Sequence, residues 1–355
     1  MGAHQSKHRD EDHVCPVHDL AENASSPLYG DTSFYDFNKI LSGSCATFAC
    51  GIMLVHIIRH ANHLSNPGEQ VKIMRIALLI PLNSLFSFLS ICYPAAKVYL
   101  LPWLDVFQAH ALASFFLLMC EFVSPSDDQR TIFFAAMAIP DKKAPDGGQD
   151  GLAWYRKRWI LIFQYPVVAF AAAVLTDVTE AIGIYCQYET KPYWAKLWIT
   201  VARDISVAMA IFSVIAFAIT LRPHLAGKKP LAKLIAFKLI VALSFVQDLT
   251  FWILDIAKAL KPTSTLTYAD LHMGIPSMLS CIEMVPICLL IAWVYPLSPY
   301  LLRCGRDRRT PAAERGRATV DYPRSYQGGP LGVWGLLAIL SPRENIECLV
   351  FAFRM

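Results

Sequence analysis

Seven long apolar runs, separated by polar connections, dominate the chain. They lie at 40–58, 73–93, 103–123, 159–183, 198–221, 234–254 and 275–295. A helix that crosses a bilayer needs about 20 mostly apolar residues, at about 1.5 Å of rise each. The runs have about this length, so the pattern predicts an all-α integral membrane protein with a bundle of seven transmembrane helices.

Polar segments flank the predicted bundle. Residues 1–38 contain no apolar segment of targeting length, and we expect them to form a disordered tail outside the cytosol. Residues 39–300 hold the seven runs, and residues 301–355 form a basic tail expected in the cytosol. Within that tail, residues 331–340 are apolar but too short to span a bilayer. They predict a short helix on the membrane surface or against the bundle.

Positive charges in alternate connections predict the orientation of the bundle. Arg59, Lys72 and Arg75 flank the first connection, and further cations precede the fourth and sixth runs and follow the seventh. The remaining connections carry carboxylates with fewer cations. Because loops rich in Lys and Arg stay on the cytosolic side, the N-terminus is expected outside and the C-terminus in the cytosol.

The composition agrees with a membrane protein. Hydrophobic residues make up 55% of the chain and charged residues only 17%, a balance that soluble domains rarely show. The basic residues lie in loops and the tail and not in one interleaved patch, so no nucleic-acid partner is expected. The lipid bilayer of the plasma membrane or of an endomembrane is the expected environment.

The ten cysteines lie mostly in or beside apolar runs, where they would pack as small side chains. Cys92 and Cys186 both fall near the expected outer face, where they could form a disulfide. Asn23 begins an Asn-Ala-Ser glycosylation sequon, which would be modified if the N-terminal tail is extracytosolic.

Polar residues inside the apolar runs are the candidate functional groups. An ionisable side chain at mid-depth of a spanning helix costs at least about 2.5 kcal/mol, so it needs a partner or a wet path. We expect that these side chains line a path for a solute. The candidates are Lys238, Gln247, Asp248, Glu283, Asn83, Ser87 and Asp105. A structural ion pair is the alternative for Lys238 and Glu283, and helix packing is the alternative for the Asn83–Ser87 face.

The expected outer half of the bundle is rich in carboxylates, with Arg203 as its main cation. We expect Arg203, Asp177 and Glu180 at the interface, solvated by water. At the opposite side of the membrane, three histidines at positions 56, 60 and 63 share one helix face. They lack a fixed acidic or cysteine ligand beside them, so neither a metal nor another cofactor is expected.

Between about His63 and Pro342, a set of short motifs follows in a characteristic order. The set includes Asn66-Pro67, Glu69-Gln70, Arg75-Ile76, Gln164-Tyr165, Lys229-Pro230, Glu283-Met284 and the tail segment Tyr326-Gln327-Gly328-Gly329. This order resembles the organic solute transporter alpha-subunit family, in its broader eukaryotic seven-pass branch. The resemblance implies a seven-helix bundle that moves organic solutes such as steroid or bile-acid conjugates down their gradients. In the best-known animal branch it also implies a small single-pass beta subunit.

The favoured hypothesis is facilitated transport of an amphipathic, steroid- or lipid-like organic solute. A small single-pass beta-type subunit or a second copy of the chain is the expected protein partner. A seven-pass receptor and a non-transporting membrane scaffold are the alternatives, although the third run ends Cys120-Glu121-Phe122 where a receptor would carry Asp-Arg-Tyr. No enzyme is expected, because no metalloprotease, nucleophile-elbow or phosphate-loop motif is present.

Overall fold

The computed structural model describes residues 15–16, 26–139, 149–187, 189, 191–224, 259–302 and 325–341, with individual positions in 233–257 and 344–351. In this part of the chain the regular elements are helices, apart from one minimal hairpin in which β1 (Ala138–Ile139) pairs antiparallel with β2 (Gln149–Asp150). Six helices are long and apolar enough to cross a membrane. Of the sixth predicted run, 234–254, the structure describes about half of the positions, and these are helical.

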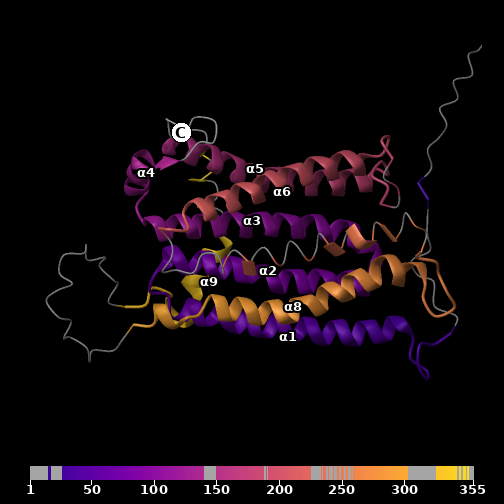
Figure 1. Ribbon diagram of the computed structural model, residues 1–355. Coiled ribbons are helices and arrows are strands. Elements are labelled where there is room, and N and C mark those ends of the chain that lie inside the picture. Colours follow the sequence, from indigo (N-terminus) through magenta and orange to yellow (C-terminus); the bar gives the residue numbers. More distant parts are fainter. Residues whose placement is uncertain are drawn as a thin grey trace, which may run out of the picture.

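The six long helices form one bundle (Figure 1). They are α1 (Phe34–Asn62), α2 (Pro67–Cys92), α3 (Lys97–Val123), α5 (Gly151–Ala181), α6 (Ala195–Thr220) and α8 (Ile275–Val294). The central helix, α2, contacts α1, α3 and α8, while α3 also contacts α5, on which α6 packs. Most of α2 and α3 is therefore buried, whereas α1, α6 and α8 expose apolar side chains such as Phe48, Phe212 and Trp293.

Short elements close the two ends of the bundle. They are η1 (Pro94–Ala96), α4 (Asp127–Ala136), the π-helical turn η3 (Asp270–Gly274), η4 (Ser298–Tyr300), η6 (Pro330–Gly332) and α9 (Val333–Leu340). Both α4 and α9 lie at the end where α1 stops and α2 begins (Figure 1). We call this the α9 end, and we call the opposite one, where α5 is joined to α6, the disulfide end.

Short polar side chains determine where three of the helices begin. Ser33 Oγ accepts a hydrogen bond from the backbone N–H of Asp36 (3.1 Å) at the start of α1. Asn66 Oδ1 accepts one from Glu69 at the start of α2 (3.4 Å), and Asp150 caps α5 in the same way. Such caps satisfy backbone donors that have no partner within the helix. The helices therefore start several residues before the apolar runs.

Aromatic rings fill the core between α3, α4, α5 and α6. Phe134 of α4 stacks on Tyr155 of α5 with ring centroids 4.1 Å apart, and Phe116 of α3 meets Phe217 of α6 edge-on at 4.7 Å. All four rings are almost fully buried. Aromatic pairs add about 0.5–1.5 kcal/mol beyond the area that they bury, so this cluster holds the short helix α4 against the bundle.

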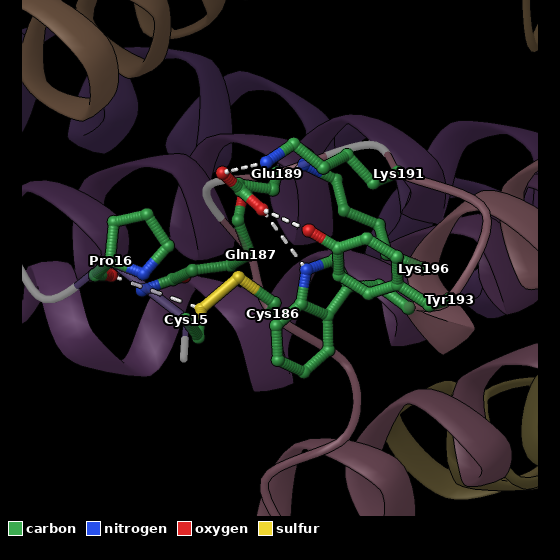
Figure 2. The surroundings of a disulfide bond; sticks show 9 residues. Cys15, Pro16, Cys186, Gln187, Glu189, Lys191, Tyr193 and Lys196 are labelled. Carbon is green, nitrogen blue, oxygen red and sulfur yellow. Dashed lines mark hydrogen bonds and ion pairs between the residues drawn. A yellow bond between two sulfur atoms is a disulfide. The ribbon is translucent and has the colours of Figure 1, made fainter. Parts of the chain in front are cut away.

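A disulfide joins Cys15 to Cys186, with their Cα atoms 5.6 Å apart (Figure 2). Cys186 lies between α5 and α6, whereas Cys92, at the end of α2, is a free and partly buried thiol. The Cys92–Cys186 pairing that the sequence left open therefore does not form, because Cys186 is bonded to Cys15. Disulfide pairing depends on proximity in space, and the position of an N-terminal tail cannot be derived from hydrophobic periodicity.

Polar contacts order the α5–α6 connection beside the disulfide (Figure 2). Glu189 Oε1 pairs with Lys191 Nζ at 2.9 Å, and Glu189 Oε2 accepts a hydrogen bond from Trp194 Nε1 at 3.1 Å. The hydrogen bonds from Lys191 and Trp194 hold the pKa of the Glu189 carboxyl below its ordinary value. Lys196 Nζ also donates to the carbonyl of Gln187 (2.7 Å). These contacts give Cys186 an ordered position to which the N-terminal segment is bonded.

Peptide mapping of the unreduced protein tests this pairing. We expect the peptide that contains Cys15 to be recovered linked to the peptide that contains Cys186, and to separate from it after reduction. Cys186→Ser should release the link, whereas the matched control Cys92→Ser should leave it intact. A recovered link between Cys92 and Cys186 would contradict the structure.

Candidate functional site

Three of the predicted solute-lining residues belong to the run at 234–254. Lys238 and Asp248 lie outside the described residues. Gln247 is described, and both ends of its amide contact α8: its Nε2 donates to the carbonyl of Pro276, and its Oε1 accepts from Ser280 Oγ at 3.4 Å. Gln247 therefore fastens its run to the first two turns of α8.

Glu283 lies near the middle of α8 and is half-buried. Among the residues that the structure describes, its carboxylate has no hydrogen-bond or ion-pair partner. Ser280 is its i−3 neighbour, so Glu283 lies near the side of α8 that Gln247 contacts. This arrangement places a carboxylate at the interface between α8 and the run at 234–254.

Asn83 and Ser87 are buried in α2, and Ser87 Oγ donates to Asn83 Oδ1 at 3.2 Å. Next to them, a polar seam runs between α1, α2 and α8 and consists of Asn38, Ser42, Ser84 and Cys281. Ser42 Oγ donates to Asn38 Oδ1 (2.8 Å), and Cys281 Sγ contacts the carbonyl of Ser84 (3.8 Å). Within the described structure, Asn38 Nδ2 and Ser84 Oγ are buried without a partner. Buried polar atoms are normally satisfied, so the seam has hydrogen-bonding capacity to spare.

Asp105 forms an ion pair across the bundle. Its Oδ2 lies 2.7 Å from Arg203 Nη1 of α6, and Arg203 also contacts Asp204 Oδ1 at 3.1 Å. Arg203 was expected to be solvated at the interface, but its side chain is only 33% exposed, and it bridges α3 and α6. Asp105 is therefore neutralised by a protein cation and has less capacity to bind a solute.

The most buried charged cluster of the described chain lies at the α9 end. Lys72 and Arg75 lie one turn apart in α2, and their side chains are only 5% and 7% exposed. Lys72 Nζ lies 3.2 Å from Glu121 Oε1 of α3 and 2.8 Å from Glu344 Oε1, while Arg75 Nη1 contacts Glu344 Oε2. We call Lys72 and Arg75 the cation pair. They hold the Glu344 carboxylate by both of its oxygens.

Arg75 also stabilises the end of α9. Its Nη2 donates to the carbonyls of Ala338 (3.0 Å) and Ser341 (3.1 Å), and its Nε donates to that of Ile339 (3.2 Å). The last carbonyls of a helix have no partner within it, and a basic side chain is well suited to bind them. The buried guanidinium of Arg75 therefore binds both the end of α9 and Glu344, which lies further along the tail.

Glycines allow the tail to approach α1 closely. A Cβ on Gly328 would lie 1.9 Å from the carbonyl oxygen of Ala61, and one on Gly335 would lie 3.1 Å from its Cα. A Cβ on Gly332 would lie 2.9 Å from the Cβ of Ala61, and the φ of +75° at Gly332 disfavours other residue types. The Gly-rich motif of the tail is thus explained by contact with the last turn of α1.

The α1–α2 connection and α5 also bind the tail. Gln70 Oε1 accepts hydrogen bonds from the backbone N–H groups of Ser65 (2.8 Å) and Asn66 (2.9 Å), and so fixes the turn. The N–H of Gln327 then donates to the carbonyl of Leu64 at 2.7 Å. On the far side, Trp159 Nε1 of α5 donates to the carbonyl of Cys348 (3.0 Å). The tail segment that includes α9 therefore contacts α1, α2 and α5.

Electrostatics favour the ionised form of Glu344. Burial alone would raise the pKa of its carboxyl, but the positive charges of Lys72 and Arg75 outweigh this effect and hold the pKa below its ordinary value. Leaving one member of a buried ion pair without its partner costs about 3–5 kcal/mol. The cation pair therefore needs an anion at this position, and the tail supplies it.

The three histidines of α1 are engaged in packing and hydrogen bonds. His60 is buried with Nε2 3.3 Å from the carbonyl of Tyr295, and His63 Nδ1 lies 2.9 Å from the carbonyl of Arg59. His56 packs edge-on against His60. Among the residues that the structure describes, no group of three or more potential metal ligands comes together.

A pocket of about 300 Å³ opens between α1 and α8. It is lined by Gly51, Ile52, Val55, His56, Arg59 and Ala292. Its walls include none of the predicted solute-lining residues. The cation pair and the polar seam also lie outside this pocket.

Sequence reasoning missed the cation pair as a site, because Lys72 and Arg75 were interpreted only as determinants of orientation. Their i, i+3 spacing on one helix face was a usable signal, since a solvated topology determinant needs no such alignment. Glu344 carried no signal of its own. It lies 269 residues from Arg75 in the chain.

Six helices that are long and apolar enough to cross a membrane, with the buried charges of Lys72, Arg75 and Arg203 neutralised by ion pairs, define a multi-pass α-helical membrane protein. A family model described as organic solute transporter Ostalpha matches residues 38–300, which is more than half of the chain. The chain belongs to this family. The resemblance noted in the sequence is thereby confirmed.

Curated relatives extend the comparison. The chain is 24% identical to Protein LAZ1 of Arabidopsis thaliana over 330 residues, which cover 86% of this chain and 65% of LAZ1. It is 25% identical to LAZ1 homolog 2 of the same plant, with 81% and 72% covered. A transmembrane protein 184 homolog of Dictyostelium discoideum is 26% identical, with 72% and 52% covered. The chain thus spans less than two thirds of LAZ1 and about half of the Dictyostelium protein. No solved structure matches the chain.

The pH dependence of stability tests the role of Glu344. Because the folded state lowers the pKa of this carboxyl, its contribution is fully present above the ordinary Glu pKa of about 4.3 and is lost as the pH falls through the lowered value. We expect Glu344→Gln to lower the melting temperature at neutral pH. The difference from wild type should stay constant down to about pH 5 and shrink below about pH 4.

Asp128→Asn is the control, because Asp128 lies in α4 at the same end of the bundle and is exposed. It should melt like the wild type at every pH. A Glu344→Gln difference that is unchanged at low pH would show that the carboxylate does not contribute through its charge.

Proposed function

We propose that this protein mediates facilitated transport of amphipathic, steroid- or lipid-like organic solutes across a membrane. Membership of the organic solute transporter family over residues 38–300 carries the proposal. The polar groups at helix interfaces support it, because buried polar atoms without partners are costly in a bilayer and are therefore often functional.

The proposed solute path follows the interface between α8 and the run at 234–254. On α8, Glu283 and Ser280 lie near the side that Gln247 contacts, and Lys238 and Asp248 belong to the facing run. Asn83 and Ser87 would support the path from α2. Polar positions that interrupt spanning helices form solute sites of this kind in other transporters. Asp105 contributes through its ion pair with Arg203, which fastens α3 to α6.

We further propose that the disulfide end is extracytosolic and the α9 end cytosolic. Disulfides persist in oxidising compartments and are rare in the cytosol, which supports this assignment for Cys15 and Cys186. The cations Arg59, Lys72 and Arg75 lie towards the opposite end, in agreement with the positive-inside rule. In this orientation Asn23 would be available for glycosylation, although it lies outside the described residues.

The protein's surroundings follow from the same reasoning. The exposed apolar faces of α1 and α6 would contact lipid of the plasma membrane or of an endomembrane. A small single-pass beta-type subunit, or a second copy of the chain, would bind against one of these faces. The family resemblance is the ground for this partner.

Flux into proteoliposomes tests the proposed function. Vesicles with the purified chain should take up a steroid sulfate or its neutral parent steroid faster than vesicles without protein. Glu283→Gln should reduce this uptake by roughly tenfold or more, since hydrogen bonds to a charged group contribute about 1.5–3 kcal/mol. Glu180→Gln, at the disulfide end of α5, is the control and should retain uptake.

The outcomes separate the function from the site. Equal uptake with and without protein across a solute panel would overturn transport, and binding without flux would favour the receptor or scaffold alternative. Wild-type uptake by a correctly folded Glu283→Gln variant would overturn the assignment of this residue alone.

A further inference from the structure

The contacts of the cation pair are those of a carboxylate-binding site. Lys72 Nζ binds one oxygen of Glu344 at 2.8 Å, and Arg75 Nη1 binds the other. An ammonium and a planar guanidinium that share one anion favour carboxylate, sulfonate or sulfate groups. Both cations are almost fully buried. The site is therefore built into the start of α2, while its anion comes from a residue 269 positions away.

The charge balance shows that the tail completes this site. Among the described residues outside the tail, the ion pairs of Lys72 and Arg75 involve one carboxylate, that of Glu121, so these ion pairs leave one of the two positive charges uncompensated. With Glu344 in place, two cations face two carboxylates. The bundle therefore presents a vacancy for a single negative charge, which the chain's own tail fills.

The surroundings of the site suit an anion with an apolar body. Close to the cation pair, α9 exposes Trp334, Leu337 and Leu340, which are 63%, 53% and 73% accessible. An apolar face of this kind lies in the boundary between lipid and headgroups. At the α9 end (Figure 1), the cation pair is thus next to a surface where the apolar part of an amphipathic anion would enter the lipid.

We infer that Lys72 and Arg75 form a binding site for the head group of an amphipathic organic anion, and that Glu344 is a tethered occupant which the anion displaces. Only the identification of this anion as a transported solute rests on the proposed function. Binding and displacement of the tail stand independently of flux. A tethered competitor lowers the apparent affinity of a free ligand by the fraction of time that it occupies the site.

Laurate and dodecanol are the probes, because they share an apolar chain and differ in the anionic head group. The full chain in phosphatidylcholine nanodiscs is titrated with each. Glu344→Gln should bind laurate on the order of tenfold more tightly than the wild type. Its affinity for dodecanol should be unchanged, and the control Asp128→Asn should bind laurate like the wild type. Equal laurate affinity for Glu344→Gln and wild type would overturn the inference.

Hydrogen exchange of the wild-type protein gives a second readout that does not depend on the folding of a variant. Saturating laurate should raise exchange in the peptides that contain residues 326–341 and Glu344, whereas dodecanol should not. Unchanged exchange with laurate bound would contradict displacement. A rise caused by phosphatidylserine nanodiscs but not by laurate would assign the site to a lipid headgroup and overturn its assignment to a solute.

Failure of the flux assay is distinguishable from failure of this inference. Laurate binding and tail displacement without any flux would overturn the proposed transport and leave the anion site standing. Flux of organic anions, with no effect of Glu344→Gln on laurate binding and no effect of laurate on tail exchange, would overturn the anion site and support the proposed transport.

Discussion

The structure at the α9 end depends on the burial of two positive charges at the start of the central helix. Lys72 and Arg75 are almost inaccessible to solvent, in a place where unpaired charges would cost several kcal/mol. Glu121 compensates one of them, and Glu344 compensates the other. Arg75 also binds the final carbonyls of α9. The ion pairs of Glu344 with Lys72 and Arg75 therefore determine where the tail lies, and glycines allow it to approach Ala61 closely.

The opposite end of the bundle follows the same rule with different chemistry. Arg203 joins Asp105 of α3 to α6, and a disulfide fastens the N-terminal segment to the α5–α6 connection. Charges within the described bundle are thus largely paired at both ends. Glu283 in the middle of α8 has no such partner among the described residues. The proposal of transport builds on this contrast between paired charges near the ends and a carboxylate in the middle of α8.

The sequence predicted the bundle well because its signal is local. Each apolar run is long enough to cross a bilayer, and each of the six described spans contains one of the predicted runs or most of it. The helices begin earlier than the runs, because Ser33, Asn66 and Asp150 act as caps in polar segments that hydropathy does not register. The three most informative pairings were not predictable. Asp105 and Arg203 are 98 residues apart, Cys15 and Cys186 are 171 apart, and Arg75 and Glu344 are 269 apart. No periodic pattern encodes such contacts.

The charge on Arg75 and the charge on Glu344 act as one unit, and a double-mutant cycle measures this coupling directly. Arg75→Gln, Glu344→Gln and the double variant are compared with wild type by the free energy of unfolding. We expect the double variant to be less destabilised than the sum of the single variants, with a coupling energy of about 1–3 kcal/mol. Effects that add to within about 0.5 kcal/mol would show instead that the two residues stabilise the fold independently.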